Sequence, residues 1–262
     1  MRFWKEKWSE MSWYRRILLA AMAVMILAFG AATPVIRSAQ GIAYGGTLLR
    51  FREEGEVRRY EGTVDGASAS FAVHPDGTVE YRWGDFVYGP YQVILDASAA
   101  PEAFGSSMTG FEIRRGEELL FRGGALPSDQ LFLYGEDGEP VWELTIRAQT
   151  GGGTVMGEDG RAITPEEDHQ PSLSTLARVA LWPELTHRGS VGLYLLTTLL
   201  ALFNILQICF PGFFFRLSLW PHVRNLEEAE PSEFYIAMEK LEWLVLAGVC
   251  LFCYYGAANA IA

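Results

Sequence analysis

The chain's one closely spaced cysteine pair is Cys250-Leu-Phe-Cys253, a spacing that suits a redox pair or half of a metal site. Structural zinc needs four ligands, and a redox pair needs a polar, accessible setting. This pair instead lies within a twenty-residue apolar stretch, with no histidine near it in sequence. We interpret both thiols as small packing residues and expect neither a metal ion nor a cofactor.

An acidic turn occurs twice, as Glu136-Asp137-Gly138 and Glu158-Asp159-Gly160. Calcium loops place oxygen ligands at alternating positions along the chain, and neither copy has that pattern. Asp-Gly pairs are typical of tight turns. We therefore predict two solvated hairpin turns rather than calcium sites.

Motifs for nucleophilic or phosphate chemistry are absent from the sequence. It contains no Gly-x-Ser-x-Gly elbow and no phosphate-binding glycine loop. The four histidines are scattered, and the lysines, Lys5, Lys7 and Lys240, all lie outside the central region. We assign no catalytic residue and expect a protein that is not an enzyme.

Aromatic residues are the remaining chemical feature of the central region. A binding module presents exposed aromatic side chains on a rigid sheet, and five such residues lie close together here. Some of them must belong to the core, but as a set they are the candidate ligand-facing residues: Tyr81, Trp83, Phe86, Tyr88 and Tyr91.

Three uncharged stretches of twenty residues organise the rest of the chain: residues 17–36, 191–210 and 243–262, the last with Trp243 at its start. A helix of that length spans about 30 Å, the thickness of the hydrocarbon core of a bilayer. We predict three transmembrane helices, the last two forming a hairpin. A cleaved signal peptide is the alternative for the first stretch, because Gly30-Ala31-Ala32 offers small residues for cleavage.

Basic residues set the predicted orientation. Residues 1–16 carry five Lys or Arg against two acidic residues, a net charge of +3, and they resemble a short helix at a headgroup surface. The N-terminus should therefore be cytoplasmic, residues 37–190 extracytoplasmic and residues 211–242 cytoplasmic. The plasma membrane is the expected location.

The central region has the patterns of antiparallel β structure. Val79, Tyr81 and Trp83 alternate with polar residues, the period of a half-buried strand. Turn pairs at residues 76–77, 115–116, 137–138 and 159–160 separate such segments, and residues 97–109 read as a long loop. We predict an α+β membrane protein with an antiparallel β sandwich or an open barrel between the first helix and the hairpin.

Helix signals follow the β region. Ser172 is a plausible N-cap for an amphipathic helix bearing Leu173, Leu176 and Val179 on one face. We interpret it as a collar resting on the membrane. The resulting domains are an interfacial segment and first span (1–36), a β domain (37–170), a collar helix (171–190) and a hairpin (191–262).

Small and polar residues mark the predicted contact between the hairpin helices. An amide that faces lipid is costly, so Asn204 should turn toward protein. Five residues are the candidate packing contacts: Thr197, Ala201, Asn204, Ala247 and Cys250. Transport of a solute would need more polar groups than these stretches offer.

The loop between the hairpin helices carries a resemblance. Residues 214–238 contain Ala229, Glu230, Pro231 and Ser232, and they resemble an uncharacterised bacterial membrane-protein family of two-helix hairpins with an Ala-Glu-Pro-Ser signature. Residues 88–93 and 108–124 are similar to a β-rich region that larger members join to this hairpin. The resemblance implies residence in a bacterial membrane and assigns no catalytic residue.

The net charge of the central region argues against nucleic acid as a partner. Residues 37–190 carry 13 arginines against 24 acidic residues, a net charge of −11 that repels nucleic acid. The leading hypothesis is an envelope binding or interaction module held at the lipid bilayer, with a protein or envelope ligand as partner. The alternatives are an accessory or sensing subunit that contacts a partner through the Ala-Glu-Pro-Ser loop, and an extracytoplasmic hydrolase with a dispersed site.

Overall fold

The computed structural model describes residues 11–126, 131–143, 148–149, 155–156, 161–220 and 230–261. The chain forms two compact units: a helical unit of residues 1–39 and 187–262, and a β unit of residues 40–186. The large antiparallel sheet and the long apolar helices agree with the predicted α+β class.

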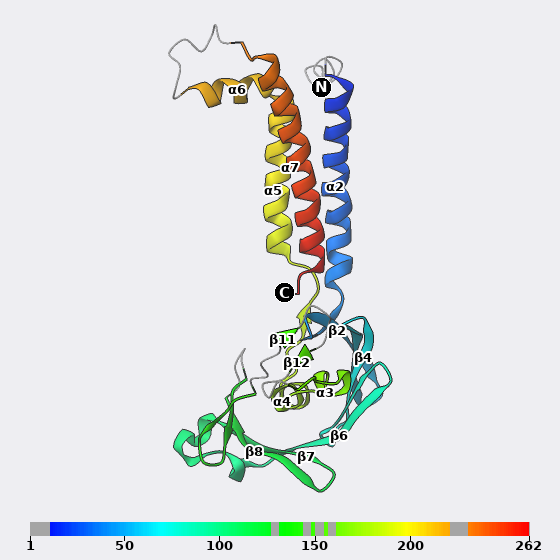
Figure 1. The fold of residues 1–262 in the computed structure, drawn as a ribbon, viewed down its shortest axis with the longest axis vertical. Helices are drawn as coiled ribbons and strands as arrows, with labels where there is room; N and C mark the ends of the chain where they lie inside the picture. Colours follow the sequence, from blue (N-terminus) through cyan, green and yellow to red (C-terminus); the bar gives the residue numbers. More distant parts are fainter. Residues whose placement is uncertain are drawn as a thin grey trace. The chain divides into compact units, whose positions relative to one another are not determined.

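One antiparallel sheet dominates the β unit. Its strands β1 to β10 lie side by side in the order in which they occur in the sequence, and Figure 1 shows the sheet curving around a pair of short helices. The prediction was a sandwich or an open barrel. The sandwich is wrong, because this consecutive meander is one curved sheet rather than two facing ones, and the open barrel stays a prediction. A separate pair, β11 (Ala148–Gln149) and β12 (Val155–Met156), has two strands. The strands of the meander are β1 (Gln40–Tyr44), β2 (Thr47–Glu54), β3 (Val57–Val64), β4 (Ala67–Val73), β5 (Thr78–Trp83), β6 (Phe86–Leu95), β7 (Thr109–Arg115), β8 (Glu118–Ala125), β9 (Leu133–Gly135) and β10 (Pro140–Val141).

The register of the strands builds an aromatic row across the inner face of the sheet. Because side chains alternate between faces along a strand, residues opposite one another on neighbouring strands share a face. Five strands contribute directly opposed aromatic residues, and the rings of Phe71 and Tyr81 stack with centroids 4.3 Å apart. The row runs through Phe51, Tyr60, Phe71, Tyr81 and Tyr88.

Two short helices complete the β unit, α3 (Pro165–Asp168) and α4 (Leu173–Leu181). Ser172 caps α4 by accepting a hydrogen bond from Thr175 N, as predicted for this residue. The apolar face of α4, with Leu176 and Val179, is buried in the same core as the aromatic row. The collar interpretation is therefore wrong: the helix forms, but its apolar face packs on the sheet instead of on a membrane.

The predicted turns within the described residues connect neighbouring strands. Residues 76–77 and 137–138 lie between paired strands, and residues 115–116 are the last residue of β7 and the first of the turn to β8. Residues 159–160 lie outside the described residues. Gly77 has φ of +84°, and a Cβ atom there would lie 2.3 Å from the carbonyl oxygen of Val93. That turn therefore requires glycine. The predicted long loop contains two 3₁₀ turns, η1 (Ala97–Ala99) and η2 (Glu102–Ser107).

The helical unit contains α2 (Trp13–Arg37), α5 (Val191–Cys209), α6 (Pro211–Leu219) and α7 (Glu233–Asn259), and β13 (Thr186–His187) lies where the two units join. By length and composition, α2 and α5 could each cross a membrane. Figure 1 shows α2, α5 and α7 side by side. Helix α6 was not predicted, because it lies within residues 211–242, the predicted loop between the two hairpin helices.

Contacts between the long helices fix their relative directions. Tyr14 OH donates to Lys240 O (2.8 Å) near the starts of α2 and α7, and Phe29 stacks on Tyr254 (4.9 Å between centroids) nearer their ends. These two helices are therefore parallel. At the start of α5, Ser190 N donates to Ala257 O near the end of α7 (2.9 Å), so α5 runs antiparallel to both.

Candidate functional site

Metal and thiol chemistry find no support in the described part of the chain. No group of three or more His, Cys, Asp or Glu side chains is placed there to hold a metal ion. Cys250 is fully buried and Cys253 half-buried, and both are free thiols on α7. Cys250 belongs to the packed interior of the helical unit.

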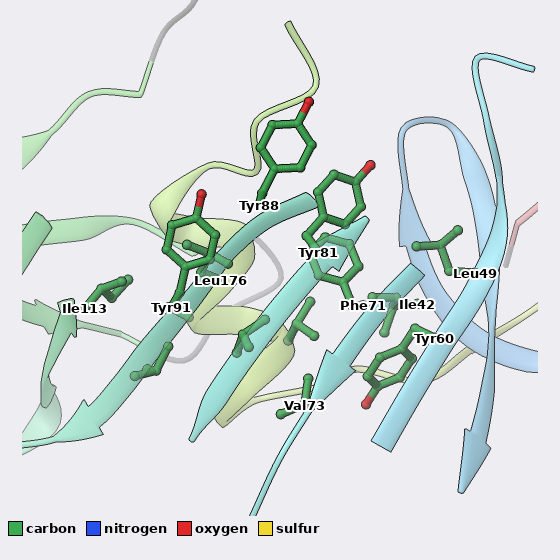
Figure 2. Close-up of a cluster of buried hydrophobic side chains, with 14 of the residues drawn as sticks. Ile42, Leu49, Tyr60, Phe71, Val73, Tyr81, Tyr88, Tyr91, Ile113 and Leu176 are labelled. Atoms are coloured by element: carbon green, nitrogen blue, oxygen red, sulfur yellow. The ribbon is translucent and has the colours of Figure 1, made fainter. Parts of the chain in front are cut away.

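Three of the five candidate ligand-facing aromatics are core residues, so their predicted role is wrong. Tyr81, Tyr88 and Tyr91 are buried, and Figure 2 shows their rings rising from neighbouring strands with Leu176 of α4 among them. Burial raises the pKa of each of these phenols. The physical reason is the curvature of the sheet, which places this face against α4.

Trp83 and Phe86 remain partly exposed at the end of the β5–β6 hairpin. They are directly opposed across the two strands, and their ring centroids are 5.9 Å apart. Val87 follows on the other face of the sheet and is 60% exposed. We call Trp83, Phe86 and Val87 the hairpin tip.

His169, at the end of α3, stacks on the indole ring of Trp83 with centroids 3.5 Å apart. Its Nδ1 lies 2.8 Å from Pro165 O, and its Nε2 lies 3.3 Å from Asp65 Oδ2. Both ring nitrogens are therefore occupied by oxygen partners of the protein. This arrangement holds α3 against the sheet.

A cluster of charged side chains lies on the outer face of the sheet, centred on Arg122 of β8. Its guanidinium pairs with Asp96 (2.9 Å), Glu112 (2.8 Å) and Glu136. Asp96 also accepts hydrogen bonds from Ser98, from the backbone N (2.9 Å) and from the hydroxyl (2.7 Å). These bonds and Arg122 lower the pKa of Asp96 to about 2.

The contacts of this Arg122 cluster connect the loop after β6 and the β9–β10 turn to strands β7 and β8. In that turn, Asp137 Oδ1 accepts a hydrogen bond from Glu139 N (3.0 Å), as expected for a tight turn. One carboxylate oxygen of Asp137 and one of Glu136 therefore have partners within the protein. The second copy of the turn, residues 158–160, lies outside the described residues.

All five candidate packing residues are buried in the helical unit: Thr197, Ala201, Asn204, Ala247 and Cys250. Asn204 Nδ2 donates to Trp243 O across the α5–α7 contact (3.1 Å) and lies 3.9 Å from the sulfur of Met22 on α2. The amide therefore lies among all three long helices.

The Ala-Glu-Pro-Ser signature marks the start of α7. Ser232 is the N-cap and accepts a hydrogen bond from Tyr235 N (3.2 Å), with Glu233 in the first turn. Glu230 and Pro231 are exposed, and Ala229 lies outside the described residues. This part of the motif accounts for the beginning of a helix.

Two features of the β unit were missed in the sequence. Arg122 is far in sequence from Asp96, and His169 is far from Asp65. The order of strands β6 to β8 brings the first pair together, and the packing of α3 against the sheet brings the second. The sole signal for His169 was its place after an acidic helical turn.

Comparison with known proteins gives no match to any family model, curated protein or solved structure.

Proposed function

We propose that this is an integral membrane protein whose helices α2, α5 and α7 cross the plasma membrane and whose β unit binds a protein partner without catalysing a reaction. The observation that carries the binding role is a contrast within the described β unit. His169 and Arg122, its most chemically suggestive groups, are engaged in internal contacts, whereas the hairpin tip offers exposed apolar surface.

Packing in the helical unit supports three crossings. Helix α7 packs along both α2 and α5, the two helices apolar and long enough to span. If these two cross the bilayer, α7 lies at the same depth beside them. The basic N-terminal residues favour a cytoplasmic N-terminus, which would leave the β unit extracytoplasmic.

Retention of the first span is supported by its contacts. Leu18, Leu19 and Met22 of α2 are buried in the shared interior with α5 and α7. The helix also continues through residues 30–32, the candidate cleavage site, to Arg37. A cleavable signal peptide would contribute no such packing to the mature protein.

The hairpin tip has the make-up of a small protein-binding surface. Phe86 and Val87 point to opposite faces at the end of the hairpin, and two charged residues lie beside them: Asp85 in the turn and Arg82 directly opposite Val87. Protein interfaces likewise combine apolar residues with polar neighbours. The accessory-subunit role through the Ala-Glu-Pro-Ser loop stays a prediction.

Photo-crosslinking tests the binding role. A photoreactive amino acid at Val87, in the full-length chain in its native membrane, should give a discrete protein adduct. The same substitution at Glu56, which is exposed in the β2–β3 turn, is the matched control. Phe86→Ser should abolish the Val87 adduct while the melting temperature changes little.

Three results would contradict the proposal: no adduct at Val87, adducts of equal yield at both positions, or a Val87 adduct that persists in Phe86→Ser. A glycan in place of a protein at Val87 would replace the protein partner with a carbohydrate ligand.

A further inference from the structure

We propose that α6 is a membrane-surface helix whose apolar stripe, formed by Phe213, Leu217 and Trp220, contacts lipid at the cytoplasmic boundary of the bilayer. The inference rests on the proposed function, since it requires α5 to cross the membrane. It deepens that function by assigning lipid contacts to residues outside the spans.

A sharp corner in the chain places α6 across the spanning helices. Phe210 has φ of −130° and ψ of 54°, so α5 ends there, and Pro211 starts the next helix at its first position. A residue before proline is disfavoured in the α conformation, whereas proline suits a first turn. Figure 1 shows α6 running across, and not along, α5 and α7.

The exposed side of α6 carries an apolar stripe. Phe213, Leu217 and Trp220 are spaced by four and three residues, which places them on one helical face. They are 62%, 47% and 72% exposed, respectively. Large apolar side chains gathered on one exposed helical face are typical of a surface that contacts lipid or another protein.

The opposite side of α6 fixes how the helix is turned. Phe215 is buried, and its ring packs edge-on against Tyr235 of α7 with centroids 4.9 Å apart. This contact orients the apolar stripe away from the helical unit. The described part of the helical unit therefore leaves the stripe uncovered.

Continuity with α5 identifies the occupant of this stripe as lipid. Phe214 packs edge-on against Phe203 of α5, with centroids 5.6 Å apart. Phe203 is itself exposed on the surface that α5 would present to the bilayer. The apolar surface of the span thus extends around the corner onto α6.

The residue types also suit the interface. Trp220 is of the kind that concentrates at headgroup level, and exposed Arg216 lies within the same turns. A helix with aromatic and aliphatic residues on one side and a basic residue beside them lies in the plane of the interface. The helix would then fix the depth of α5 in the bilayer.

Spin-label accessibility tests the inference. Single cysteines at Phe203, Leu217 and Ser218 would be introduced in a full-length background lacking Cys209, Cys250 and Cys253. The probe is the reconstituted protein in vesicles of phosphatidylcholine and phosphatidylglycerol. Labels in lipid are accessible to oxygen and protected from a water-soluble nickel complex; labels in water show the reverse.

We expect a lipid signature at Phe203→Cys and at Leu217→Cys, with the oxygen-to-nickel ratio several-fold higher at Leu217 than at Ser218, one residue further along. An aqueous Leu217 beside a lipid-exposed Phe203 would overturn this inference alone. A Leu217 label shielded from both reagents would overturn it in favour of protein contact. An aqueous label at Phe203 would overturn the proposed membrane function.

Discussion

We predict that the contact between α5 and α7 depends on small side chains more than on the polar Asn204, and paired substitutions separate the two contributions. Ala201 is fully buried, so Ala201→Phe forces an aromatic ring between packed helices. Overpacking of this kind costs about 1–3 kcal/mol, and more where the helices must separate. Leu202→Phe, one residue on and 45% exposed, is the matched control and should stay within about 0.5 kcal/mol of the parent protein.

Asn204→Leu should cost about 1 kcal/mol or less. The substitution removes the hydrogen bond to Trp243 O, and hydrogen bonds between membrane helices average about 0.6 kcal/mol. It also removes Oδ1, a buried oxygen that accepts no hydrogen bond from the described residues. That loss offsets part of the cost.

Reversible unfolding in mixed detergent micelles, followed by far-ultraviolet circular dichroism, measures these free energies. The expected order of destabilisation is Ala201→Phe first, Asn204→Leu second and Leu202→Phe last. Equal effects of the two phenylalanine substitutions would refute close packing at Ala201. A cost above about 3 kcal/mol for Asn204→Leu would refute the minor role of its hydrogen bond.

Three further predictions concern the β unit, measured as the melting temperature of the full chain. Because the pKa of Asp96 is lowered to about 2, its ionised form stabilises the fold above about pH 4, the unfolded value, and this contribution is lost as the pH falls through 2. The difference in melting temperature between the parent protein and Asp96→Asn should therefore shrink between pH 4 and pH 2. A constant difference would contradict this prediction. Ser172→Ala removes the N-cap of α4 and should cost about 1 kcal/mol, whereas no change would show that the cap is dispensable. Gly77→Ala should destabilise the protein much more than Gly116→Ala. Both glycines have positive φ, but only at Gly77 would the new Cβ meet a carbonyl oxygen. Equal effects would argue against that turn geometry.

Local signals in the sequence predicted local structure well. Ser172 was identified as a cap, and the pair at residues 76–77 as a turn, because both depend on hydrogen bonds within a few residues. The apolar stretches likewise predicted long helices, since their length exceeds that of ordinary core segments. These features need no knowledge of the rest of the fold.

The sequence did not indicate which surfaces of the helices and strands would pack against one another. The apolar face of α4 suits a membrane or a sheet equally, so the collar interpretation had no local signal against it. Alternation placed Tyr81 and Trp83 on one face of β5, but it did not indicate that Tyr81 would be fully buried and Trp83 only partly buried. Contacts such as Arg122 with Asp96 depend on which strands pair and in what register, here β6, β7 and β8. Helix α6 was hidden because Pro211 reads as a helix end as readily as a helix start.

Side-specific labelling tests the central claim most directly, namely that the β unit lies outside a membrane crossed by the helical unit. Ser107→Cys on the exposed loop after β6 and Glu230→Cys before α7 would be made separately in the cysteine-free background. A membrane-impermeant maleimide should label Ser107→Cys on intact cells and Glu230→Cys only after permeabilisation. Labelling of Glu230→Cys on intact cells, with Ser107→Cys protected until lysis, would contradict the orientation, and equal labelling of both without lysis would contradict the crossing itself.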